Sequence, residues 1–170
     1  MDLKSKIRDI KDFPKEGIIF RDITTLLKDP DALKCSIDEL AKVVKQDEFD
    51  IVVGPESRGF IFGVPIAYNL SKGIALIRKK GKLPAEVVRK EYALEYGTAE
   101  IEIHKDAIKK GQKVVVVDDL LATGGTAKAI IELIEELGGE VVSLNFLIEL
   151  DDLNGRELLK GYKINSILHY

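Results

Sequence analysis

Two adjacent carboxylates followed by a turn of small residues form the part of this 170-residue chain best suited to chemistry. Asp118 and Asp119 follow four consecutive valines and precede a turn that reads Ala-Thr-Gly-Gly-Thr. Small side chains let the backbone N–H groups of such a turn converge on an anion, and the positive end of a following helix strengthens the attraction. Two threonine hydroxyl groups add donors. We therefore predict a phosphate-binding loop formed by Ala122, Thr123, Gly124, Gly125 and Thr126.

The two acids would repel a phosphate unless they bind another part of the same ligand. Carboxylates accept hydrogen bonds from hydroxyl groups, and they can also hold a magnesium ion through water. A sugar phosphate meets both demands, with its phosphate in the loop and its hydroxyl groups on Asp118 and Asp119. The segment lacks the lysine of a Walker loop, so that class of nucleotide site is not indicated.

The charge distribution is consistent with a small anionic ligand, although a charge run by itself more often marks a solvated loop. The chain has 26 Lys and Arg against 29 Asp and Glu, a net charge of −3, which is not typical of a nucleic-acid binder. Within this balance, the segment 78–90 holds six cations and one acid, Glu86. These cations are Arg78, Lys79, Lys80, Lys82, Arg89 and Lys90.

Composition and length set the class of protein. Hydrophobic residues make up 45% of the sequence and charged residues 32%, as in ordinary globular domains. No apolar run approaches the ~18 residues of a membrane-spanning helix, and the N-terminus lacks the apolar core of a signal peptide. The single cysteine, Cys35, excludes an intrachain disulfide. We expect one domain that is located in the cytoplasm and binds neither membrane nor nucleic acid.

The elements that must position these residues alternate between strands and helices. This alternation predicts an α/β fold with a central, mainly parallel sheet flanked by helices. Ligands bind such sheets at the carboxyl ends of the strands, so the loops after Val53, Ile77 and Val117 are the expected site. The expected strands are 50–54, 74–77, 113–117, 141–147 and 162–168, with helices at 30–44, 59–70 and 126–137.

Two further regions carry expectations of their own. The segments 87–92 and 100–104 are expected to pair as a hairpin across the turn between them. At the N-terminus, 1–10 is expected to form a short helix, and 13–28 is expected to be a loop because Pro14 and Gly17 interrupt it.

Motifs along the chain resemble a known family. The segment 114–126 resembles the phosphoribosyl pyrophosphate signature of type I phosphoribosyltransferases. Five other segments, in order, resemble the adenine phosphoribosyltransferase family. They are the purine-binding segment Phe13–Ile23, the pyrophosphate loop Gly54–Phe60, the two ends of a lid at Arg78–Pro84 and Glu91–Gly97, and the C-terminal segment Leu153–Glu157.

The resemblance implies a fold and a reaction. The fold would be the type I phosphoribosyltransferase fold in one domain, 1–170, with an N-terminal purine-binding hood at about 1–30 and a flexible hairpin lid at about 79–100. The reaction would transfer the 5-phosphoribosyl group from phosphoribosyl pyrophosphate to N9 of adenine, giving AMP and pyrophosphate. Its transition state would resemble an oxocarbenium ion. Magnesium would be held by the substrate, with water linking it to Asp118 and Asp119, and a homodimer is expected.

The same resemblance assigns roles around the leaving pyrophosphate. Arg58 would hold this anion as a catalytic residue, assisted by backbone N–H groups around Ser57 and Gly59. Lys79 and Lys82 would approach it when the lid closes over the site and excludes water. Arg78 would act across a dimer, in the neighbouring subunit's site.

Other roles concern the purine. Glu95 would be the general acid/base near N7, and Tyr96 would orient the same region. Phe20 would stack on adenine, which aromatic rings favour, while Leu120 or Leu121 covers the other face. The main chain at Ile19 and Arg21 would read the edge of the base.

Two alternatives remain at this stage. A 6-oxopurine phosphoribosyltransferase would typically read its base with a lysine on the strand after the phosphate loop, and 141–150 contains none. A regulator that binds phosphoribosyl pyrophosphate without turnover would carry a DNA-binding module, and we expect the twelve residues before Phe13 to be too few for one.

Overall fold

The computed structural model of the protein describes residues 1–93 and 97–170. The chain divides into an N-terminal unit, Met1–Glu39, and a larger unit, Leu40–Tyr170. None of the described helices is both long and apolar enough to span a bilayer.

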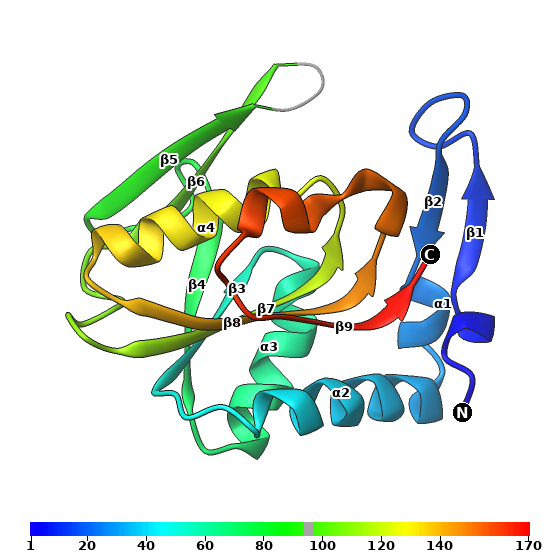
Figure 1. Ribbon diagram of the computed structural model, residues 1–170, viewed down its shortest axis with the longest axis horizontal. Coiled ribbons are helices and arrows are strands. Elements are labelled where there is room, and N and C mark those ends of the chain that lie inside the picture. The colour runs from blue at the N-terminus through cyan, green and yellow to red at the C-terminus, as the bar shows by residue number, and fades with distance from the viewer. Residues whose placement is uncertain (94–96) are drawn as a thin grey trace. The chain divides into compact units, whose positions relative to one another are not determined.

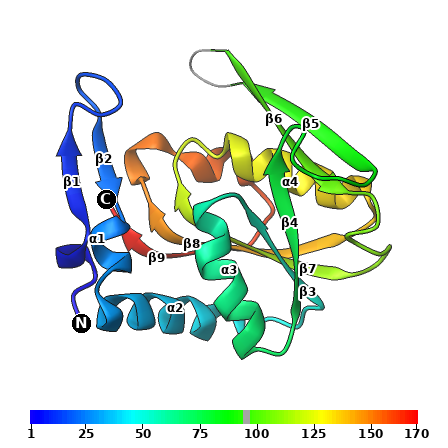
Figure 2. The same cartoon turned by 180° about the vertical axis from the view of Figure 1, so that it is seen from behind.

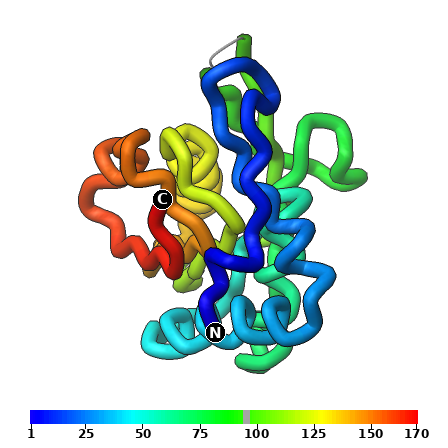
Figure 3. The backbone as a smooth tube through the Cα atoms, turned by 90° about the vertical axis from the view of Figure 1, so that its right-hand side faces the viewer, coloured from blue at the N-terminus to red at the C-terminus, as the bar shows by residue number. Residues whose placement is uncertain are grey.

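The N-terminal unit contains a short antiparallel hairpin. After the 3-10 turn η1 (Lys4–Lys6), strands β1 (Arg8–Lys11) and β2 (Ile19–Asp22) lie side by side (Figure 3). The helix α1 (Thr24–Leu27) follows, and the unit ends within α2 (Pro30–Val44).

The predictions of a helix at 1–10 and of a loop throughout 13–28 are therefore wrong. The pairing sets Arg8 opposite Asp22 and Asp9 opposite Arg21, and each opposed pair forms an ion pair. Strand pairing across a loop depends on such partners, which a local pattern in one segment does not reveal.

Helix α2 begins where the sequence predicted a helix, at residue 30. Asp29 Oδ1 accepts hydrogen bonds from the backbone N–H groups of Asp31 and Ala32, at 3.0 and 3.1 Å. A carboxylate before the first turn satisfies N–H groups that have no partner within the helix.

The larger unit is built on a seven-stranded sheet with the order β5-β6-β4-β3-β7-β8-β9 (Figure 1). Strands β4, β3, β7, β8 and β9 are parallel, whereas β6 is antiparallel to β4, and β5 to β6. The mainly parallel sheet predicted from the sequence is confirmed. Its strands are β3 (Ile51–Pro55), β4 (Gly73–Lys79), β5 (Val87–Ala93), β6 (Thr98–His104), β7 (Lys113–Leu121), β8 (Glu140–Glu149) and β9 (Ile164–His169).

Helices cover both faces of this sheet. In Figure 1, α4 (Gly125–Glu136) lies above the strands and α3 (Arg58–Asn69) below them, and Figure 2 shows α3 from the other side. Val114 and Val116 of β7 share a buried cluster with Ile130 of α4. Val115 and Val117 are equally buried but point to the opposite face, because side chains alternate along a strand.

Strand β7 is longer than predicted. It continues to Leu121 and stays paired with β8, with Leu121 opposite Glu149. Asp118 and Asp119 are therefore held within a paired strand, which gives their carboxylates fixed positions.

The hairpin of β5 and β6 also agrees with prediction. Its register runs from Val87 opposite His104 to Ala93 opposite Thr98. Strand β5 packs against α4, so the hairpin lies next to the helix that follows the small-residue turn. The chain between β8 and β9 forms two 3-10 turns, η2 (Asp151–Leu153) and η3 (Gly155–Leu159).

Candidate active site

The small-residue turn shapes a cavity at the carboxyl end of β7. Gly124 adopts a left-handed conformation with φ of 89°, which turns the chain sharply into α4 at Gly125. The cavity has a volume of about 340 Å³. Twelve of the predicted site residues line it: Ser57, Arg58, Lys79, Asp118, Asp119, Leu120, Leu121, Ala122, Thr123, Gly124, Gly125 and Thr126.

The first turn of α4 gives this cavity an attraction for anions. The initial N–H groups of a helix have no partner within it, and its dipole places positive charge at this end. Gly124 and Gly125 offer no side chain in front of these groups. The arrangement can bind a phosphate group through main-chain donors.

The paired acids lie next to the start of α3. Arg58, the first residue of this helix, donates a hydrogen bond from Nε to Asp119 Oδ2 at 2.5 Å. The backbone N–H of Asp119 donates to Asp118 Oδ1 at 2.8 Å. The backbone of Gly59 lies close to the carboxylate of Asp118. A methyl group on Gly59 would be only 3.0 Å from Asp118 Oδ1.

These contacts give the two acids different electrostatic surroundings. Loss of hydration raises the pKa of Asp118 well above its ordinary value, and the negative charge of Asp119 raises it further. Arg58 lies against Asp119 directly and offsets its charge. The charged form of Asp118 is therefore disfavoured by its surroundings.

A second cavity of about 410 Å³ adjoins the first and is lined in part by the hairpin β5–β6. The two share Pro55, Glu56, Lys79, Tyr92 and Thr126 in their walls. Arg78 lines the second cavity, where its Nε donates to Glu56 Oε2 at 2.6 Å.

The cationic segment 78–90 is more neutral than its sequence suggests. Four of its six cations form ion pairs with carboxylates brought close by the fold. These pairs are Arg78–Glu56, Lys80–Glu100, Arg89–Glu102 and Lys90–Glu132. Lys79 lines both cavities, whereas Lys82 is not among the described residues that line either.

The residues expected to bind the purine belong to the N-terminal unit. The ring of Phe20 meets that of Phe13 edge to face, with centroids 5.2 Å apart. Ile19 is half-exposed, and Arg21 pairs with Asp9 at 2.7 Å. Glu95 and Tyr96 lie outside the residues that the structure describes.

Tyr92 lines both cavities and was not predicted from the sequence. Its hydroxyl oxygen accepts a hydrogen bond from Thr126 Oγ1 at 3.2 Å, and its ring lies 3.8 Å from the position of a methyl group on Gly125. Side chains alternate along β5, and this alternation places Tyr92 on the face toward α4. The same alternation in the sequence could have identified Tyr92 as a site residue.

The fold and this loop define the class of protein. Residues 23–167 match the family model described as "Phosphoribosyl transferase domain". The class therefore agrees with a cavity that combines an anion-binding turn with two acids.

Similarity to individual proteins is narrower. The chain is 64% identical to an adenine phosphoribosyltransferase of Lachnoclostridium phytofermentans, over 99% of this chain and 97% of that protein. The crystal structure of adenine phosphoribosyltransferase from Thermoanaerobacter pseudethanolicus superposes with a TM-score of 0.97 at 54% identity, covering 99% and 98% of the two chains. That of the Saccharomyces cerevisiae enzyme, complexed with adenine and an imino-altritol bisphosphate, gives 0.91 at 39% identity, covering 98% and 96%. The chain belongs to the adenine phosphoribosyltransferase family.

Proposed function

We propose that this protein transfers the 5-phosphoribosyl group of phosphoribosyl pyrophosphate to N9 of adenine, releasing AMP and pyrophosphate. The observation that carries the proposal is the cavity in which Asp118 and Asp119 adjoin the turn 122–126 and Arg58. A 5-phosphate fits the turn, and the acids fit the sugar hydroxyl groups. The Saccharomyces cerevisiae enzyme forms a complex with adenine, which supports the choice of base.

In this mechanism Arg58 meets the negative charge that develops on the departing pyrophosphate. Such preorganised charge stabilises a transition state more than it stabilises the substrate. Backbone N–H groups at Ser57 and Gly59 assist, and Lys79 and Lys82 approach when the lid, about 79–100, closes. Arg78 is assigned to the neighbouring subunit's site.

The purine is held by the N-terminal hood, about 1–30. Phe20 stacks on one face of adenine, Leu120 or Leu121 covers the other, and the main chain at Ile19 and Arg21 reads its edge. Base stacking on an aromatic ring contributes roughly 1–3 kcal/mol. Strand β8 contains no lysine that would read a 6-oxo group, which supports adenine over hypoxanthine or guanine.

The site fits magnesium as a partner of the substrate. Mg²⁺ prefers oxygen ligands and keeps several waters, and Asp118 and Asp119 bring carboxylate oxygens to the cavity. We propose that they hold the ion through water. When bound, it would offset the charge of the pyrophosphate group.

The direct test is an assay with phosphoribosyl pyrophosphate, magnesium and one of three bases. We expect AMP with adenine and little nucleotide with hypoxanthine or guanine. Binding of phosphoribosyl pyrophosphate without any product would instead support the regulator, and product with a 6-oxopurine would support the other enzyme. Light scattering tests the predicted homodimer. The cytoplasmic location also remains a prediction.

Glu95 provides a more specific test. Replacement Glu95→Ala should lower kcat by about 10²–10⁴-fold with little change in the KM of phosphoribosyl pyrophosphate, because general acid/base catalysis acts in the transition state. Glu86→Ala is the matched control, because Glu86 is an exposed acid just before the same hairpin. Unchanged kcat in Glu95→Ala would remove this residue from the mechanism.

A further inference from the structure

Gly155 lies directly against the turn that forms the cavity. A methyl group on Gly155 would be 2.5 Å from the carbonyl oxygen of Ala122 and 2.9 Å from Leu121 Cδ1. A methyl group on Gly124 would in turn be 2.6 Å from the carbonyl oxygen of Gly155. The two backbones are therefore in contact, and neither side can move toward the other.

The residue after Gly155 fixes this segment to the sheet. Arg156 donates two hydrogen bonds to Glu149 at the end of β8, from Nε to Oε1 at 2.6 Å and from Nη2 to Oε2 at 2.8 Å. This bidentate geometry sets direction as well as distance. The Glu149 side chain is only 6% exposed, and the hydrogen bonds from Arg156 lower its pKa.

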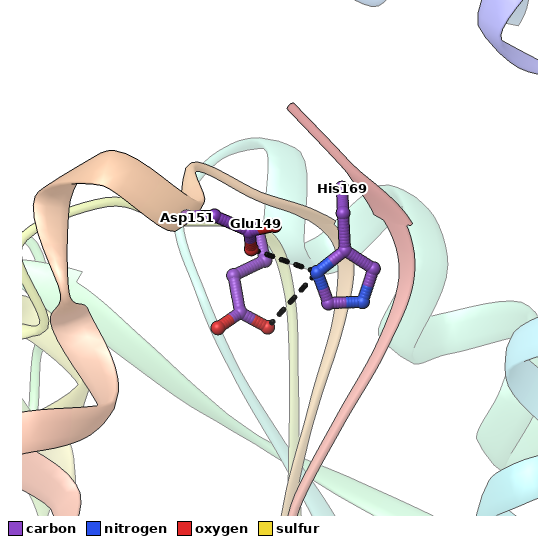
Figure 4. Close-up of side chains that lie close together, drawn as sticks. All are labelled: Glu149, Asp151 and His169. Carbon is purple, nitrogen blue, oxygen red and sulfur yellow. Dashed lines mark hydrogen bonds and ion pairs between the residues drawn. The ribbon is translucent and has the colours of Figure 1, made fainter.

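Further contacts hold the same end of the sheet. His169 Nδ1 lies 2.8 Å from Asp151 Oδ1 and 3.7 Å from Glu149 Oε2 (Figure 4). In the main chain, Tyr170 N–H donates to the Glu149 carbonyl and Asp151 N–H donates to the Tyr170 carbonyl, at 3.0 and 2.9 Å. The ends of β8 and β9 therefore form one rigid support.

Glu149, Asp151 and His169 are also residue types that bind divalent metals, and their ligand atoms lie within 4.8 Å of one another. Both carboxylate oxygens of Glu149, however, already accept hydrogen bonds from Arg156. The guanidinium charge at this position would repel a cation. The cluster therefore fits an anchor for Arg156 better than a metal site.

We propose that Gly155 and Arg156 are positioning residues for the phosphate-binding turn, an inference that rests on the proposed function. Gly155 supports the turn from behind, and Arg156, held by Glu149, keeps Gly155 in place. The support matters for catalysis because a shift of about 1 Å in a positioning group can cost on the order of 10²-fold in rate. It acts on the ligand's 5-phosphate and not on its pyrophosphate, which the loop at Ser57 and Arg58 would hold.

The test compares two products that share no phosphate site in this mechanism. Product-inhibition constants for AMP and for pyrophosphate are measured in the full-length protein, together with kcat and the KM of phosphoribosyl pyrophosphate. The variants are Gly155→Ala, Arg156→Met and the conservative Arg156→Lys. Lys160→Met is the matched control, because Lys160 forms an exposed ion pair with Glu157 just beyond the same segment.

We expect Gly155→Ala to raise both the inhibition constant of AMP and the KM of phosphoribosyl pyrophosphate by about tenfold or more. The reason is that an interaction present in both the ground state and the transition state is lost. Pyrophosphate inhibition should change less than about twofold. Arg156→Met should show the same selective loss, Arg156→Lys a smaller one, and Lys160→Met none. If Gly155→Ala does not fold, the two Arg156 variants decide.

An equal rise in the inhibition constants of AMP and pyrophosphate would overturn the inference, since it would indicate a general loss of structure. Arg156 variants that behave like Lys160→Met would overturn it too. These results differ from a failure of the proposed function, in which the unaltered protein makes no AMP from adenine.

Discussion

Arg58 and Asp119 form one ion pair in the wall of the cavity. Their ion pair, with atoms 2.5 Å apart, links the start of α3 to the end of β7. The ion pair holds the guanidinium group at the wall of the cavity, next to the paired acids. Under the proposed function, Arg58 would meet the pyrophosphate group and Asp119 the sugar hydroxyl groups.

Replacement Asp119→Asn tests the acid at this scale. The amide keeps the shape of the side chain but loses the charge that accepts a sugar hydroxyl and holds Arg58. Hydrogen bonds to charged groups contribute roughly 1.5–3 kcal/mol, so the KM of phosphoribosyl pyrophosphate should rise by about 10–100-fold. Steady-state kinetics measure it.

A matched control separates this effect from a general loss of charge. Asp106→Asn removes one negative charge from an exposed turn after β6 and should leave the KM within about twofold. If both variants have the same KM, Asp119 does not bind the sugar.

Among the elements, the hairpin β5–β6 is linked to the phosphate-binding turn by Tyr92. Thr126 Oγ1 donates to the Tyr92 hydroxyl, and Lys90 pairs with Glu132 of α4 at 3.7 Å. Because Thr126 belongs to the turn, a change in the hairpin can reach the cavity through one hydrogen bond.

Replacement Tyr92→Phe should uncouple the two elements while keeping the ring. A neutral hydrogen bond contributes about 0.5–1.5 kcal/mol, so we expect the KM of phosphoribosyl pyrophosphate to rise by less than about tenfold. Amide hydrogen exchange in β5 and β6 should become faster. Tyr68→Phe, a change at an exposed tyrosine, is the control. Unchanged exchange in Tyr92→Phe would show that the link does not hold the hairpin.

Elements with local signals were predictable from the sequence. The valines of β7, the small-residue turn and the apolar face of α4 identified the central unit and its anion-binding end. The hairpin β5–β6 followed from two segments that flank one turn. In each case the determining pattern lies within one continuous segment of the chain.

Contacts that depend on which side chains or backbones meet were not predictable in this way. The pairing of β1 with β2, the ion pairs of 78–90 and the approach of Gly155 to Ala122 all join residues without a shared local pattern. The sequence does not show whether a charged side chain faces solvent or forms an ion pair with a carboxylate. The C-terminal motif at 153–157 was visible in the sequence, but only the fold shows what it supports.

Over the whole molecule, acids in both units are stabilised in their charged form. Hydrogen bonds from Arg156 lower the pKa of Glu149 in the larger unit. In the N-terminal unit, hydrogen bonds from Thr24 and Arg8 lower the pKa of Asp22 from 3.8 to about 2. Specific ion pairs, and not the net charge of −3, therefore make the stability of the fold depend on pH.

Asp22 predicts the direction of this dependence. Its pKa is lower in the folded chain than in the unfolded chain, so the unfolded chain binds the proton more readily. The contribution of Asp22 to stability should be complete above about pH 4 and should disappear as pH falls through about 2.

Urea unfolding measured at several pH values, in the protein and in Asp22→Asn, tests this. The variant should be less stable near pH 7 and lose less on acidification, whereas Glu16→Gln, at an exposed acid of the loop between β1 and β2, should follow the unaltered protein. Parallel acid profiles for Asp22→Asn and the unaltered protein would show that another group governs the loss of stability.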